Sequence, residues 1–103
     1  VQGIGGALYE HCIYNEDGQL LTTTLADYLV PMAAEMPDMH VGHVETPTKE
    51  SLLGAKGAGE AGTAGAPAAI MNAINDALSP LGAQVFAQPF TPERILKALG
   101  KIA

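Results

Sequence analysis

Residues 54–78 read GAKGAGEAGTAGAPAAIMNAINDAL, a tract of small residues that runs into an amphipathic pattern. Twelve of the first sixteen positions are Gly or Ala. Pro67 suits the first turn of a helix, where its missing N–H group is harmless. Apolar residues then recur with helical spacing at Ile70, Ala73, Ile74, Ala77 and Leu78. The pattern predicts a helix from near Pro67 to near Ser79, preceded by an unusual Gly/Ala tract.

The Gly/Ala tract, residues 54–69, is either a flexible linker or a loop packed closely against another surface. Because it lies between a predicted strand and a well-formed helix, we favour the packed loop. Gly57–Gly62 matches the pattern G-x-G-x-x-G, but the predicted strand ends too early, near Glu45, for a dinucleotide fingerprint. What remains is a run of small residues that exposes backbone N–H groups, which suit phosphates, oxyanions or metal-oxo groups.

One acidic residue, Glu60, lies within this tract, and no other acid occurs between Glu50 and Asp76. A carboxylate on a tight apolar loop is poorly solvated, which suits it to act as a general base. The plainer alternative is an exposed glutamate beside Lys56. The spacing alone leaves both possibilities open.

The first ten residues, Val1–Glu10, combine apolar residues at helical spacing with three glycines. They predict a short Gly-rich helix, although each Gly costs roughly 1 kcal/mol relative to Ala in a helix interior. Contacts outside the helix must therefore compensate, and the glycines allow another backbone or a ligand to come close.

The rest of the chain mixes extended segments with one more helix. Asn15–Gly18 between two short apolar runs predicts a hairpin, and strands are predicted at 39–45 and 84–87. Thr91–Glu93 supplies the cap, proline and acid that begin a last helix, and Gly100 ends it. Because strands and helices do not alternate regularly, the predicted fold class is α+β, with two helices in the C-terminal part.

Length and charge restrict the class of protein. With 103 residues there is room for one core, and a compact chain of this size would have a radius of gyration of about 13 Å. The 11 acidic and 5 basic residues give a net charge of −6, which argues against a nucleic-acid partner. No apolar run approaches the ~20 residues that span a bilayer. Bulky apolar residues are few for a self-sufficient domain, so we expect a piece of a larger protein.

The side chains that could bind a metal are poorly placed. His40 and His43 would lie on opposite faces of the predicted strand, and His11 and Cys12 have no further ligand beside them. We therefore expect no metal held by protein side chains. A single cysteine can make no internal disulfide, which fits a reducing compartment and a cytoplasmic protein. Cys12 itself is expected to be buried as a small hydrophobe.

The order and spacing of several fragments resemble the C-terminal part of the molybdopterin-binding large subunit of the xanthine dehydrogenase, aldehyde oxidase and carbon monoxide dehydrogenase family. The resemblance covers residues 1–103, as a portion of one molybdopterin-binding domain. It is carried by VQGIGGALYE (1–10), NEDGQL (15–20), Asp27-Tyr28 before Pro31, GAKGAGEAG (54–62), APAAI (66–70) and Asp76-Ala77.

This resemblance implies a site and a reaction. The glutamate that matches Glu60 is the general base of a hydroxylase, in which molybdenum is held by a pyranopterin, expected in a dinucleotide form. The positions expected to bind this cofactor are Gln2, Gly3, Lys56, Gly57, Ala58 and Gly59. Both Gly-rich segments would then meet at the cofactor, where a Cβ atom would obstruct close approach.

The resemblance also implies partners. These are the remainder of the subunit, 2Fe-2S and FAD on other subunits or domains, a small-molecule substrate and an oligomeric assembly. The substrate would be an aldehyde, an N-heterocycle or carbon monoxide, and this segment alone would be inactive. The branch stays open, because the copper-binding cysteine of the carbon monoxide branch lies on a loop outside this chain. Two alternatives remain: a non-catalytic interaction or assembly domain with the same fold, and a small phosphate-binding protein.

Overall fold

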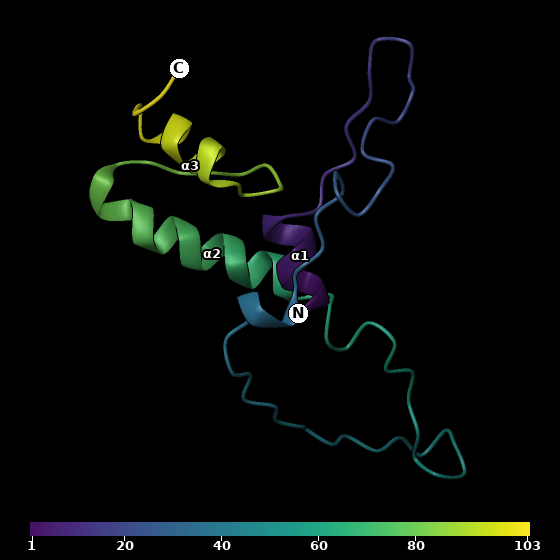
Figure 1. The fold of residues 1–103 in the computed structure, drawn as a ribbon. Coiled ribbons are helices and arrows are strands. Elements are labelled where there is room, and N and C mark those ends of the chain that lie inside the picture. Colours follow the sequence, from purple (N-terminus) through teal and green to yellow (C-terminus); the bar gives the residue numbers. More distant parts are fainter.

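The computed structural model describes all residues, 1–103, and is built from helices and loops. The helices are α1 (Gln2–Leu8), η1 (Ala33–Glu35), α2 (Ala66–Leu78), η2 (Ser79–Leu81) and α3 (Pro92–Ala98), of which η1 and η2 are 3-10 helices. The three α-helices lie together, and two long loops, residues 10–32 and 36–65, extend away from them (Figure 1). None of the helices combines the length and the apolar character needed to cross a lipid bilayer.

The chain is less compact than a self-sufficient domain of its length would be. The radius of gyration is 17.8 Å and the principal extents are 57 × 40 × 28 Å, whereas a compact chain of this length would have a radius of gyration of about 13 Å. Only 9 of the 103 residues are buried. The reason is that both loops carry large apolar side chains with nothing packed on them, including Leu25 (80% exposed), Val44 (93%) and Leu53 (91%).

A small core lies where α1, the end of α2 and the segment before α3 meet. Its buried members are Ala7, Leu78, Ala83, Val85 and Phe90. The backbone N–H of Phe90 donates a 2.7 Å hydrogen bond to the carbonyl of Ala7, which ties α1 to the C-terminal segment. The amphipathic pattern of α2 is thus confirmed, since its inner side contributes Leu78, Ile70 and Ile74 to this core or its margin.

Two of the three glycines of α1 have close neighbours. A Cβ atom on Gly3 would collide with the Cβ of Ala66, the first residue of α2. One on Gly5 would lie 2.8 Å from Cδ of Pro31. The prediction that outside contacts compensate for the glycines is confirmed, because their bare backbones allow α2 and Pro31 to approach the helix.

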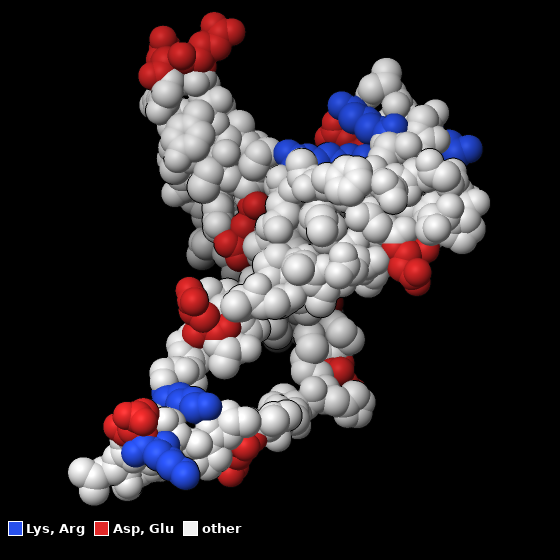
Figure 2. Space-filling model, turned by 180° about the vertical axis from the view of Figure 1, so that it is seen from behind, with Lys and Arg blue, Asp and Glu red and all other residues white.

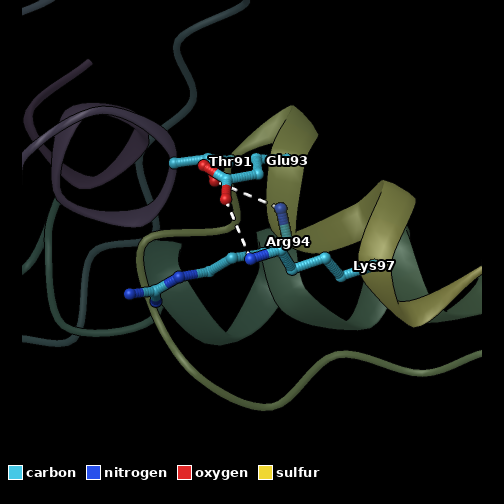
Figure 3. A network of polar contacts seen from close by, with 4 residues as sticks. All are labelled: Thr91, Glu93, Arg94 and Lys97. Atoms are coloured by element: carbon cyan, nitrogen blue, oxygen red, sulfur yellow. Dashed lines mark hydrogen bonds and ion pairs between the residues drawn. The ribbon is translucent and has the colours of Figure 1, made fainter. Parts of the chain in front are cut away.

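The last helix begins and ends as its sequence predicts. The Thr91 hydroxyl accepts a 3.4 Å hydrogen bond from the backbone N–H of Arg94, and Glu93 pairs with Lys97 at 3.1 Å (Figure 3). The Arg94 guanidinium donates to the backbone carbonyls of Ala87 and Gln88, which fixes the preceding loop. Gly100 has φ +64°, a left-handed conformation that favours glycine after a helix.

The predicted strands do not form ladders in this chain. Asn15–Gly18 does make the expected turn, with Gly18 at φ +77°, but the hairpin reduces to one antiparallel bridge between Tyr14 and Leu20. Residues 39–45 and 84–87 form no strand, so those two predictions are wrong here. A ladder needs backbone hydrogen bonds to a neighbouring strand, and neither segment makes any. The α+β class stays a prediction for the complete domain.

An asparagine side chain takes the place of a strand partner beside residues 84–87. The backbone N–H of Val85 donates to Oδ1 of Asn75 at 2.8 Å, and Nδ2 of Asn75 donates to the carbonyl of Val85 at 2.9 Å. This pair satisfies both polar groups of Val85 from α2, in the manner of a neighbouring strand. The segment is therefore fixed without a sheet.

Candidate functional site

A cavity of about 480 Å³ lies within the loop of residues 36–65, and we call it the loop cavity. Its lining includes three residues that the sequence assigned to cofactor binding: Lys56, Gly57 and Ala58. The facing side is formed by residues 44–47. The Lys56 ammonium donates a 2.9 Å hydrogen bond to the hydroxyl of Thr46, which links the two sides of the loop.

The backbone of the Gly/Ala tract offers free donors beside this cavity. No hydrogen bond within the chain uses the N–H groups of Gly57, Ala58 or Gly59. A Cβ atom on Gly57 or Gly59 would meet nothing within 4 Å. The prediction of a packed loop is therefore wrong within this chain, because no described residue covers these positions. The same openness leaves three successive amide donors accessible to an anionic ligand, so the residues present fit the oxygen-rich cofactor that the resemblance implies.

Glu60 lies on a turn that leads into α2. Its backbone carbonyl accepts hydrogen bonds from Thr63 at 3.0 Å and Ala64 at 2.9 Å, which starts a helical turn just before the helix. The side chain is exposed. The prediction that its small neighbours alone would shield the carboxylate is wrong, because Gly and Ala have no side chains long enough to cover it.

The N-terminal pair of predicted site residues lies at the start of α1. Gln2 is exposed, and Gly3 is buried against Ala66 and Pro67. Ala66 directly follows the turn that begins at Glu60. The structure thus brings the beginning of α1 to the beginning of α2, at the end of the Gly/Ala tract. Gln2 and Gly3 do not line the loop cavity, which lies farther back along the tract.

Charge is sparse around these residues. Figure 2 shows the basic side chains in two separate groups, one over the C-terminal helix and one in the loop of residues 36–65. The lining of the loop cavity contains one basic residue, Lys56, and one acidic residue, Glu45. No three His, Cys, Asp or Glu side chains gather closely enough to hold a metal ion. Cys12 is exposed rather than buried, because it lies on the loop of residues 10–32, away from the core.

Sequence reasoning missed one polar contact beside α1. The Tyr28 hydroxyl donates a 2.5 Å hydrogen bond to Oε2 of Glu10, and the pair is partly buried. This hydrogen bond is the main reason that the pKa of Tyr28 is raised from 10.0 to about 12. The two residues are 18 positions apart, and no periodicity connects them, so a sequence pattern could not have paired them.

Comparison with known proteins supports the resemblance to a molybdopterin-binding large subunit. Residues 1–37 match the family described as the molybdopterin cofactor-binding domain. The chain is 45% identical to the nicotine 6-hydroxylase large subunit of Paenarthrobacter nicotinovorans over 95% of its length, and 32% identical to the carbon monoxide dehydrogenase large chain of Hydrogenophaga pseudoflava over 95%. The crystal structure of quinoline 2-oxidoreductase from Pseudomonas putida 86 superposes on 99% of this chain with a TM-score of 0.90 and 44% identity.

These matches define a family and a place within it. The chain belongs to the molybdenum oxidoreductases that include xanthine dehydrogenase and carbon monoxide dehydrogenase, and it is a segment of their molybdopterin-binding large subunit. It spans 12% of the nicotine 6-hydroxylase large subunit, 12% of the carbon monoxide dehydrogenase large chain and 13% of the quinoline 2-oxidoreductase chain.

Proposed function

We propose that this segment forms one wall of the molybdenum cofactor site in a hydroxylase and supplies its general base, Glu60. The observation that carries this proposal is the run of unpaired amide donors at Gly57–Gly59, directly before the only carboxylate of the Gly/Ala tract. When bound, the cofactor supplies the two-electron redox chemistry. The chain itself would bind the cofactor, hold it in position and accept a proton.

The binding role falls on two short stretches of backbone. The N–H groups of Gly57, Ala58 and Gly59 would donate to the cofactor, and the absence of side chains there permits close approach. Lys56 would add a positive charge beside them, since its ammonium already lies at the loop cavity. At the start of α1, the exposed amide of Gln2 can both donate and accept, and Gly3 keeps the helix close to α2.

Glu60 would accept, on a carboxylate oxygen, the proton released by the oxygen nucleophile that attacks the substrate carbon. General-base catalysis by a placed side chain contributes typically 10²–10⁴-fold. Other parts of the subunit must shield this carboxylate, because it is exposed in the segment itself. The turn that begins at its carbonyl would hold it at a fixed distance from α2 and hence from Gln2.

An N-heterocyclic aromatic compound is the substrate class that we favour. The two proteins above that share 44–45% of their residues with this chain are named for nicotine and quinoline, both nitrogen heterocycles. The carbon monoxide dehydrogenase is less similar, at 32%. A dinucleotide form of the cofactor, and 2Fe-2S and FAD partners that carry electrons away, complete the proposal.

The proposal is tested by Glu60→Gln in the complete enzyme, with Glu50→Gln as the control. Glu50 is an exposed acid of the same loop and lies outside the loop cavity. We expect E60Q to reduce kcat by about 10²–10⁴-fold at unchanged molybdenum content, and E50Q to leave both quantities unchanged. Turnover of E60Q near the wild-type value would overturn the assignment of Glu60.

A further inference from the structure

We propose that Glu10 and Tyr28 are positioning residues that hold α1, and through it Gln2, in place at the cofactor. This inference rests on the proposed function of Gln2. The Tyr28 hydroxyl donates to Oε2 of Glu10 at 2.5 Å, across 18 residues of chain. A hydrogen bond from a hydroxyl to a carboxylate at this distance belongs to the strong class. It joins the start of the loop of residues 10–32 to its far end.

The Glu10 carboxylate also lies directly on α1. A Cβ atom on Gly5 would be 2.7 Å from Oε1 of Glu10 and 2.8 Å from Cδ of Pro31. The backbone N–H of Glu10 donates to the carbonyl of Gly5 at 2.9 Å. Both Glu10 and the Tyr28–Pro31 segment therefore pack onto the middle of the helix, at a position where only a residue without a side chain fits.

Helix α1 needs this support from outside. It has seven residues, three of them Gly, and isolated helices of that length are not stable in water. Gly3 and Ala7 are four positions apart and share one face of the helix, which contacts Ala66 and accepts the hydrogen bond from Phe90. Gly5 lies on the opposite face. The Glu10–Tyr28 pair and Pro31 thus hold the side of α1 that α2 does not reach.

The family match covers α1 and the loop that packs against it. The residues that match the molybdopterin cofactor-binding domain, 1–37, include α1, Glu10, Tyr28 and Pro31, but not the Gly/Ala tract. The matched segment therefore contains both α1 and the loop that packs against it. Loss of the hydrogen bond would free one side of the helix and shift Gln2, its first residue.

The test is the rate at which the complete enzyme loses molybdenum during dialysis, measured for Tyr28→Phe and Tyr14→Phe. Tyr14 is an exposed tyrosine (58%) in the same loop and serves as the matched control. Loss of a hydrogen bond to a charged group typically changes an equilibrium constant by about tenfold or more. We therefore expect Y28F to lose molybdenum about tenfold faster than the wild type. We expect Y14F to match the wild type. Glu10→Gln, which keeps an oxygen acceptor for Tyr28, should restore most of the retention that Glu10→Ala loses.

A double substitution separates positioning from general stability. If Tyr28 acts through Gln2, Y28F adds little to the loss already caused by Gln2→Ala, whereas a purely structural effect adds in full. Additive effects, or wild-type retention in Y28F, would overturn the positioning role while leaving the proposed function intact. Wild-type retention in Q2A would instead overturn the cofactor contact of Gln2, and the positioning role with it.

Discussion

Gly3 of α1 lies so close to Ala66 of α2 that a methyl group on Gly3 would overlap the Ala66 side chain. This contact joins the N-terminal residues of the chain to the end of the Gly/Ala tract. It places the start of α1, with Gln2, beside the start of α2, which follows the turn that begins at Glu60.

We therefore expect Gly3→Ala to destabilise the enzyme by about 1–3 kcal/mol, the usual cost of overpacking, and to lower its Tm. Gly6→Ala is the matched control, because a Cβ atom there would meet nothing within 4 Å. Since Ala favours helices over Gly, G6A should be neutral or slightly stabilising. The compensating change Ala66→Gly should rescue G3A. A G3A enzyme as stable as G6A would show that α1 and α2 are not in close contact.

The hydrogen bonds of Asn75 to Val85 give a second prediction. Asn75→Ala removes the hydrogen-bond partners of the Val85 N–H and carbonyl groups. Leaving these two backbone groups unsatisfied should destabilise this region by about 1–3 kcal/mol. The Val85 amide should then exchange hydrogen faster, as measured by mass spectrometry of the complete subunit. Asn72→Ala, at an exposed position of the same helix, should leave exchange unchanged. Equal protection of Val85 in both variants would refute the pairing.

The cap of α3 gives a third prediction. Thr91→Ala should destabilise the helix by about 0.5–1 kcal/mol, the lower part of the usual range, because the hydrogen bond to Arg94 is long at 3.4 Å. Thr91→Ser keeps the hydroxyl and should retain most of the stability. Glu93→Gln breaks only an exposed ion pair and should change stability by about 0.5 kcal/mol or less. A larger effect of E93Q than of T91A in thermal unfolding would contradict this ranking.

Tyr28 gives a pH-dependent prediction. Its pKa is raised from 10.0 to about 12, chiefly by the hydrogen bond to Glu10, so the folded state keeps the phenol proton more tightly than the unfolded state does. The stabilisation is complete below pH 10 and is lost as the pH rises toward 12. After a rapid jump to pH 11, tyrosinate absorbance should show one tyrosine fewer ionised in the wild type than in Glu10→Ala. Equal absorbance in the two proteins would mean that the hydrogen bond is absent.

The sequence was most informative where a pattern is local. The helix after Pro67 and the capped helix after Thr91 follow from spacing and end residues within a few positions of each other. The strands at 39–45 and 84–87 could not be judged in this way, because a ladder depends on a neighbouring backbone that local alternation does not reveal. At Val85, the Asn75 side chain makes the backbone hydrogen bonds that a neighbouring strand would otherwise make.

The sequence proposes residues for the candidate site but does not describe their surroundings. The resemblance around Glu60 leads us to propose this residue as the base, yet burial of a carboxylate depends on what packs over it, and Gly and Ala provide no cover. The contact of Glu10 with Tyr28 depends on how the loop of residues 10–32 folds back on α1, which no sequence period encodes.

A crystal structure of the complete subunit with its cofactor tests the central claim most directly. We predict that the N–H groups of Gly57–Gly59 donate to the cofactor, and that other segments of the subunit bury Glu60. Its carboxylate would then lie within hydrogen-bond reach of the reacting atoms, roughly 2.6–3.2 Å or through one water. A Glu60 side chain still open to solvent, with those amide groups turned away from the cofactor, would contradict the account.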